Sequence, residues 1–84
     1  MEEEKVGVVT RYFAHLGVAA IKLERPLKVG DTIHVLGHTS DFTQSVGSMQ
    51  QEHASIAEGQ PGQEIAIKVI EHARQRDEVY RVAT

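Results

Sequence analysis

The sequence has 84 residues and a mass of 9.3 kDa, a size that accommodates one domain. Apolar residues make up 40% of the chain and charged residues 25%, close to ordinary globular values, so wholesale disorder is not expected. Cysteine is absent, which excludes disulfides, thiolate-bound zinc and iron–sulfur clusters. The formal net charge of −3 argues against a strong electrostatic grip on nucleic acid, which normally needs a basic surface.

The chain shows no targeting pattern. It begins with the acidic residues Glu2, Glu3 and Glu4, where a secretion signal would be basic and then apolar. The longest purely apolar run, Val18–Ile21, is far shorter than the about 20 residues of a membrane helix. We therefore expect a cytoplasmic protein with a flexible acidic N-terminus, residues 1–5, and a single domain, residues 6–84.

Turn-forming residues divide the chain at short intervals. Gly provides positive φ, Pro fixes φ, and Asp and Ser bond to the nearby backbone. The stretches between the turns are rich in Val, Ile, Thr, Tyr and Phe, and this spacing predicts an all-β barrel or sandwich. The predicted turns are Ala14–Gly17, Glu24–Pro26, Val29–Asp31, Gly37–Asp41, Glu58–Gly62 and Arg74–Asp77.

Apolar residues alternate along these stretches, as in strands that bury one face. The stretch from Phe42 to about Gln51 changes face at Met49, beside Gly47, which indicates a β-bulge. The alternating sets are Val6, Val8, Thr10 and Tyr12; Ala19, Ile21 and Leu23; Ile33 and Val35; Phe42 and Val46; Ile65, Ile67 and Val69; and, with a weaker pattern, Val79, Tyr80 and Val82.

The segment Gln63–Arg76 is ambiguous between a strand and a helix. Its apolar residues also recur at helical spacing, from Ile65 to Ala73. Four β-branched residues, at positions 65, 67, 69 and 70, favour a strand. The residues by themselves leave both alternatives open.

Three blocks of the sequence have a recognisable order. The first joins Val6-Gly7-Val8-Val9 to the run from Leu27-Lys28-Val29-Gly30-Asp31 to Gly37, the second is Ser45–His53, and the third is Ala57–Ile67. Together they resemble the second, β-barrel domain of translational GTPases such as elongation factor Tu. The resemblance implies a closed six-stranded antiparallel β-barrel with a strand at Gln63–Ile70.

The same type of barrel resembles small stand-alone elongation-factor-like proteins and the C-terminal domain of the U32 peptidase family. No G-x-x-x-x-G-K-[ST] loop occurs, so we expect neither GTPase activity nor a nucleotide cofactor. The resemblance implies a non-enzymatic binding module that contacts RNA, the ribosome or a translation-associated protein. The alternative is a protein-interaction or accessory barrel that works with a separate enzyme such as a U32-type peptidase.

The candidate binding residues are Gln50, Gln51, Glu52 and His53. In the translation factors the corresponding strand end lies by the surface that meets the aminoacylated 3′ end of tRNA, so the resemblance implies contact with RNA. The alternative interpretation is a polar strand end that faces solvent. Arg74 and Arg76 are candidate phosphate contacts, and four further cations could join them if the fold clusters them: Arg11, Lys22, Lys68 and Arg81.

The residues do not predict catalysis or a metal site. His34 and His38 are four apart, but they span a strand end and a turn instead of one helix face. No Ser lies in a G-x-S-x-G elbow, and the carboxylates are scattered. We therefore expect no catalytic residue, metal or cofactor, while the partner and the oligomeric state stay open.

Overall fold

The structure of the protein is a computed structural model that describes residues 3–83. These residues form strands and turns without a helix, which confirms the all-β prediction, and hence contain no helix that could span a membrane. The strands are β1 (Glu3–Phe13), β2 (Val18–Leu23), β3 (Leu27–Lys28), β4 (Thr32–Leu36), β5 (Asp41–Ser45), β6 (Met49–Gln51), β7 (Ala54–Ser55), β8 (Glu58–Gly59), β9 (Glu64–Lys68) and β10 (Glu78–Val82).

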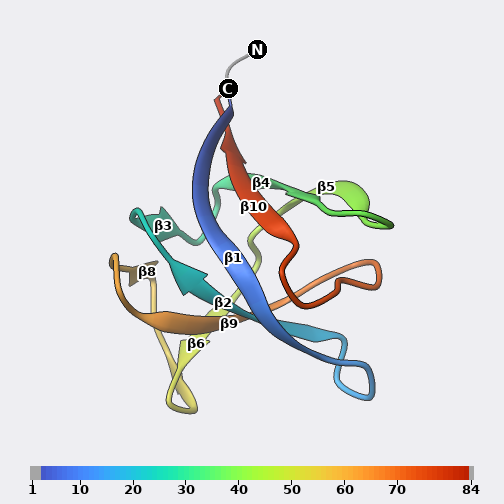
Figure 1. The fold of residues 1–84 in the computed structure, drawn as a ribbon. Helices are drawn as coiled ribbons and strands as arrows, with labels where there is room; N and C mark the ends of the chain where they lie inside the picture. Colours follow the sequence, from blue (N-terminus) through green and yellow to red (C-terminus); the bar gives the residue numbers. More distant parts are fainter. Residues whose placement is uncertain (1–2, 84) are drawn as a thin grey trace.

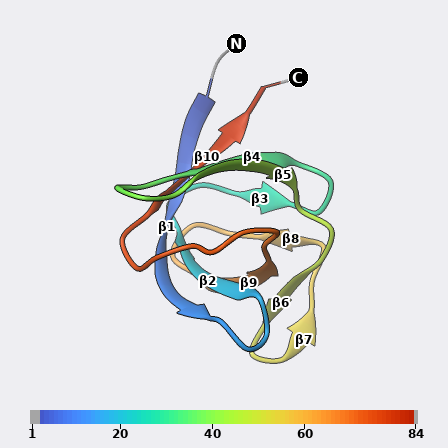
Figure 2. The ribbon, with the colours of Figure 1, turned by 90° about the vertical axis from the view of Figure 1, so that its right-hand side faces the viewer.

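Eight of the strands form one antiparallel sheet in the order β5-β4-β10-β1-β2-β9-β6-β7, and β3 pairs with β8 separately. Only three residues, Val46–Ser48, connect β5 at one end of this order to β6 near the other. The sheet must therefore curl until its two ends approach each other, as Figures 1 and 2 show.

The gap between the two ends is bridged by a side chain. Within residues 3–83, no strand pair joins β5 to β6 or β7. The Gln44 amide of β5 instead reaches the chain at the end of β9: its Nε2 donates to the Lys68 carbonyl at 2.8 Å, and its Oε1 accepts from the Ile70 N–H at 2.7 Å. The pairing thus forms a strongly curled sheet, and Gln44 spans its seam.

The inside of the curl holds one apolar core, because alternate residues of each strand point inward. The prediction that Ala19, Ile21 and Leu23 share a buried face is confirmed, as is the corresponding prediction for Ile33 and Val35. The remaining buried members of the cluster are Val6, Val9, Leu27, Phe42, Val46, Met49, Ile65, Ile67, Ala73 and Val79.

The ambiguous segment Gln63–Arg76 is a strand only in its first part. Residues Glu64–Lys68 are extended as β9, which pairs with β2 on one side and with β6 on the other. The helical alternative for Gln63–Arg76 is wrong, because residues 69–77 form a loop that returns to β1. Of the four β-branched residues that favoured a strand, Ile65 and Ile67 lie in β9, whereas Val69 and Ile70 lie beyond its end.

The predicted alternation along the first strand needs correction. Val6 and Val9 are fully buried, whereas Val8 and Thr10 are only half-buried. The register shifts between Lys5 and Gly7 against β10, and again between Val9 and Arg11 against β2. Each irregularity adds one residue to β1 and reverses the face that later residues present, which simple alternation does not anticipate.

The fourth predicted strand, Phe42 to about Gln51, is two strands. Phe42, Val46 and Met49 are all buried, so the change of face beside Gly47 is confirmed. The chain does not continue as one bulged strand, however, but leaves β5 and enters β6 at the opposite end of the sheet order.

The flexible N-terminus expected for residues 1–5 also needs correction where the structure describes it. Glu3–Lys5 are the first residues of β1 and pair with β10, Glu3 opposite Val82. Two of these side chains have partners of opposite charge: Glu4 pairs with Arg81, and Lys5 Nζ lies 3.4 Å from Glu78 Oε2. Residues 1 and 2 lie outside the described residues.

Candidate functional site

The four candidate residues at positions 50–53 lie on one hairpin. β6 and β7 pair as Gln50 with Ser55 and Gln51 with Ala54, so Glu52 and His53 form a two-residue turn. Both turn residues have positive φ, 51° and 68°, as the tight primed turns of hairpins require. Gln50, Glu52 and His53 are exposed, so the hairpin presents a polar tip to solvent.

The two candidate phosphate contacts, Arg74 and Arg76, lie on the loop between β9 and β10. Figure 1 shows this orange-to-red loop well apart from the yellow β6–β7 hairpin, so the structure does not bring the two candidate groups together. It does place Arg74 beside Arg11, which comes from the end of β1. We call the hollow that these two arginines line the arginine groove.

The arginine groove has a volume of about 380 Å³ and lies between β1 and the loop of residues 69–77. The rings of Tyr12 and His72 lie together in its lining, with centroids 4.4 Å apart and a tilt of 43°. Within residues 3–83, neither Arg11 nor Arg74 forms an ion pair with an acidic side chain. The groove therefore combines two cations with a pair of rings.

Backbone bonds fix the loop that carries Arg74. The Val9 N–H donates to the Asp77 carbonyl at 2.8 Å, and the Arg76 N–H donates to the Val9 carbonyl at 2.7 Å. The Arg74 N–H donates to the buried Asp77 carboxylate at 2.8 Å, and Ala73 is fully buried in the core. The position of Arg74 beside β1 is thus set by the fold.

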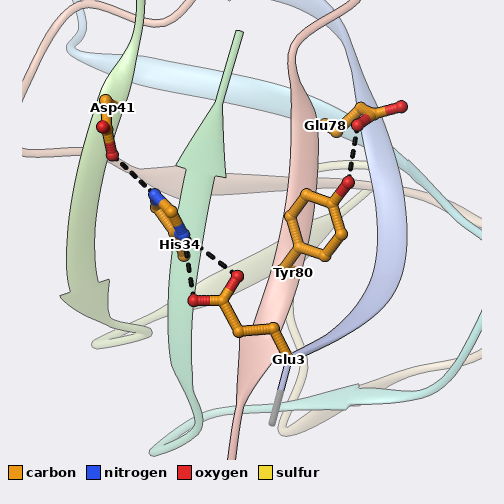
Figure 3. Close-up of polar contacts among 5 residues, drawn as sticks. All are labelled: Glu3, His34, Asp41, Glu78 and Tyr80. Carbon is orange, nitrogen blue, oxygen red and sulfur yellow. Dashed lines mark hydrogen bonds and ion pairs between the residues drawn. The ribbon is translucent and has the colours of Figure 1, made fainter. Parts of the chain in front are cut away.

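A second polar cluster lies on the outer face of β1, β10, β4 and β5, where His34 lies between two carboxylates (Figure 3). Its Nε2 is 2.6 Å from Asp41 Oδ1, and its Nδ1 is 3.1 Å from both carboxylate oxygens of Glu3. The hydrogen bond to Asp41, followed by that to Glu3, raises the pKa of His34 above its ordinary value of 6.5. Both ring nitrogens are engaged, so neither is available to a metal or a substrate.

A neighbouring pair occupies β10. The Tyr80 hydroxyl donates to Glu78 Oε1 at 2.6 Å, which raises the pKa of Tyr80 and lowers that of Glu78 (Figure 3). No group of three or more metal-ligating side chains occurs among residues 3–83. On this face, ion pairs and hydrogen bonds between side chains join β1, β10, β4 and β5.

Sequence reasoning missed two of these arrangements. It considered His34 together with His38, but the pairing of β4 with β5 brings His34 to Asp41. It named Arg11 among cations that could cluster with Arg74, but it could not single Arg11 out, because nothing local links it to His72 and Arg74 some 60 residues later. The return of the 69–77 loop to β1 brings these residues to the lining of one hollow.

Comparison with known proteins shows that this chain is similar to parts of proteins named as peptidases. No family model matches the chain. The chain is 32% identical over 77 residues to an uncharacterized protease of Methanocaldococcus jannaschii, which covers 90% of the chain and 19% of that protein. It is 36% identical over 78 residues to a collagenase of Porphyromonas gingivalis, covering 90% of the chain and 22% of the collagenase.

The fold matches a domain of known structure. The crystal structure of the C-terminal domain of a candidate U32 peptidase from Geobacillus thermoleovorans superposes with a TM-score of 0.89 at 20% identity, covering 95% of this chain and 93% of that one. The selenomethionine variant of that domain superposes with a TM-score of 0.86 at 22% identity, covering 90% of this chain and 96% of that one. The expected resemblance to this type of domain is confirmed for the fold, whereas the resemblance to elongation factor Tu is not shown.

The alignments cover only a small part of each relative. The chain spans about a fifth of the length of the curated relatives it matches. The similarity therefore concerns one domain-sized part of those proteins.

Proposed function

We propose that this chain is a non-enzymatic accessory barrel that works with the catalytic part of a peptidase-type protein. The observation that carries the proposal is the match of nearly the whole chain to a separately folded C-terminal domain of a U32-type peptidase. The alignments with the protease and the collagenase support it, because each pairs 90% of the chain with only about a fifth of the relative. The remaining four-fifths of such a protein has room for the catalytic machinery.

The closed six-stranded barrel expected from the sequence belongs to this proposal. The three-residue connection from β5 to β6 and the Gln44 bridge support closure of the curled sheet. A closed sheet has no long free edge. It therefore presents no unpaired strand that could form unwanted hydrogen bonds with a larger neighbouring unit.

The exposed hairpin of Gln50–His53 is the first candidate contact surface for the catalytic part. A two-residue turn holds its polar tip in a defined shape, and its side chains can donate or accept hydrogen bonds without moving the core. The translation-associated interpretation of the same hairpin has no support from the comparisons.

A chimera tests the proposal. The segment of the Porphyromonas gingivalis collagenase that aligns with this chain is replaced by the chain, and cleavage of collagen is compared with the parent and with a deletion of the segment. We expect the deletion to lose most activity and the chimera to recover at least half of it. A chimera with an unrelated barrel of similar length controls for simple spacing.

Two results would contradict the accessory role. The first is a deletion variant that is as active as the parent, because the segment would then contribute nothing. The second is a chimera with this chain that is no better than the unrelated barrel. A His53→Ala chimera, compared with Lys22→Ala, then reports whether the hairpin forms the contact.

A further inference from the structure

We propose that the arginine groove binds a short acidic peptide segment that carries an aromatic side chain. In this arrangement carboxylates of the peptide bond to Arg11 and Arg74, and its ring lies against Tyr12 and His72. The proposal depends on the groove alone and not on the peptidase association above.

The charges in the groove favour an anionic ligand. Some cations of the described chain have carboxylates nearby: Lys5 Nζ lies 3.4 Å from Glu78 Oε2, and Arg25 Nε lies 3.7 Å from Glu4 Oε2. Arg11 and Arg74 line one hollow with no acidic partner among residues 3–83. A guanidinium presents two parallel N–H donors that match a carboxylate, so two arginines suit a ligand with two carboxylates.

The two rings supply the apolar part of the site. Tyr12 is half-buried and packs against the core, so its orientation is restrained, whereas His72 is exposed on the loop. Their centroids are 4.4 Å apart, just below the spacing of about 4.5–7 Å that aromatic pairs prefer, so the two rings are in close contact. An aromatic side chain of the ligand can stack against this pair of rings. The pair therefore gives the groove a preference for an aromatic ligand in addition to its preference for negative charge.

The groove is largely formed before a ligand arrives. The backbone bonds between β1 and the loop, together with the buried Ala73, hold the loop in place. A site with fixed walls loses less conformational entropy on binding than a flexible one. A shallow groove with only two cations nevertheless limits affinity to about the millimolar range.

The overall charge distinguishes a peptide from nucleic acid. Twelve acidic residues oppose nine basic ones, so a polyanion is repelled by the rest of the surface. Two arginines neutralise about two negative charges, which matches two carboxylates but leaves most phosphates of an oligonucleotide unpaired. The observations therefore favour the short acidic peptide.

The test uses the full chain labelled with ¹⁵N and three probes at up to about 5 mM. The probes are the peptide acetyl-Asp-Phe-Glu-amide, its neutral analogue acetyl-Asn-Phe-Gln-amide, and a uridine tetranucleotide. We expect the acidic peptide to shift the amides of Arg11, Tyr12, His72 and Arg74, and the neutral peptide to bind at least about tenfold more weakly.

Two variants locate the site. Arg11→Gln and Arg74→Gln should each weaken binding of the acidic peptide about tenfold, whereas Arg25→Gln, with the same loss of charge elsewhere, should leave it within about twofold. Amide spectra of the free variants show whether each one keeps the fold. The proposal is overturned if the acidic peptide causes no shifts, if the two peptides bind equally, if Arg25→Gln acts like Arg74→Gln, or if the tetranucleotide binds more tightly.

Discussion

Replacing Gly59 by alanine should destabilise the protein through a specific contact in the core. A Cβ on Gly59 would lie 2.6 Å from Leu23 Cδ1, 3.1 Å from Ile65 Cγ2 and 3.4 Å from Met49 Sδ. All three side chains are fully buried, so they have little room to move. Overpacking of this kind costs about 1–3 kcal/mol. In a domain of this size, that lowers the melting temperature by about 4–8 °C for each kcal/mol.

A second substitution tests whether Leu23 is the cause. Leu23→Val removes the atom that a Cβ at Gly59 would meet first, at its own cost of about 1 kcal/mol for the lost methylene. In the Leu23→Val background, Gly59→Ala should therefore cost at least about 1 kcal/mol less than it does alone. Urea unfolding of the four proteins, followed by circular dichroism, measures this coupling.

Gly47→Ala is the matched control for Gly59→Ala. A Cβ on Gly47 meets no atom within 4 Å, and its φ is not positive, so we expect a change within about 0.5 kcal/mol. Additive effects of Gly59→Ala and Leu23→Val would refute the contact that we assign. Equal destabilisation by Gly47→Ala and Gly59→Ala would show that glycine flexibility, and not packing, governs both sites.

Two further predictions concern polar contacts. The His34 pKa, followed by NMR titration, should lie above 6.5 and should fall more in Asp41→Asn than in Glu3→Gln, because the Asp41 hydrogen bond is the larger cause. Since folding raises this pKa, its contribution to stability is complete below about pH 6.5 and is lost as the pH rises through the folded value, and His34→Gln should remove that dependence. Gln44→Ala should cost about 1–2 kcal/mol and speed hydrogen exchange at the Ile70 amide, whereas unchanged exchange would contradict its role at the seam.

Much of the strand pattern could be predicted from the residues, because burial of one face imposes a period of two. Ile21, Ile33 and Ile67 are buried as predicted. The first strand departs from the period because bulges insert extra residues, and no residue type marks them. The break between β5 and β6 also escaped prediction, since a change of face beside Gly47 is equally consistent with a bulge and with a chain that crosses to another part of the sheet.

The candidate site was less predictable than the fold. Polarity correctly indicated that Gln50, Glu52 and His53 face solvent, because a polar strand end is a local feature, whereas Gln51 is half-buried. The arginine groove depends on a long-range contact between β1 and the 69–77 loop, and the His34 cluster depends on the pairing of β4 with its neighbours. Such contacts are set by strand order, which composition and periodicity do not determine.

The position of the last strand has a consequence for how the protein acquires its fold during synthesis. β10 lies between β4 and β1, so the strand that follows all the others in this sequence occupies an interior place in the sheet. Until it leaves the ribosome, β1 and β4 each present an unpaired edge to other nascent chains. The sheet can therefore be completed only after translation has reached residues 78–82, and the pairing of Glu3 with Val82 joins residues that are far apart in the sequence. Such non-local pairing is slow, on the order of milliseconds to seconds, so the newly made chain passes through an interval in which it is open to aggregation.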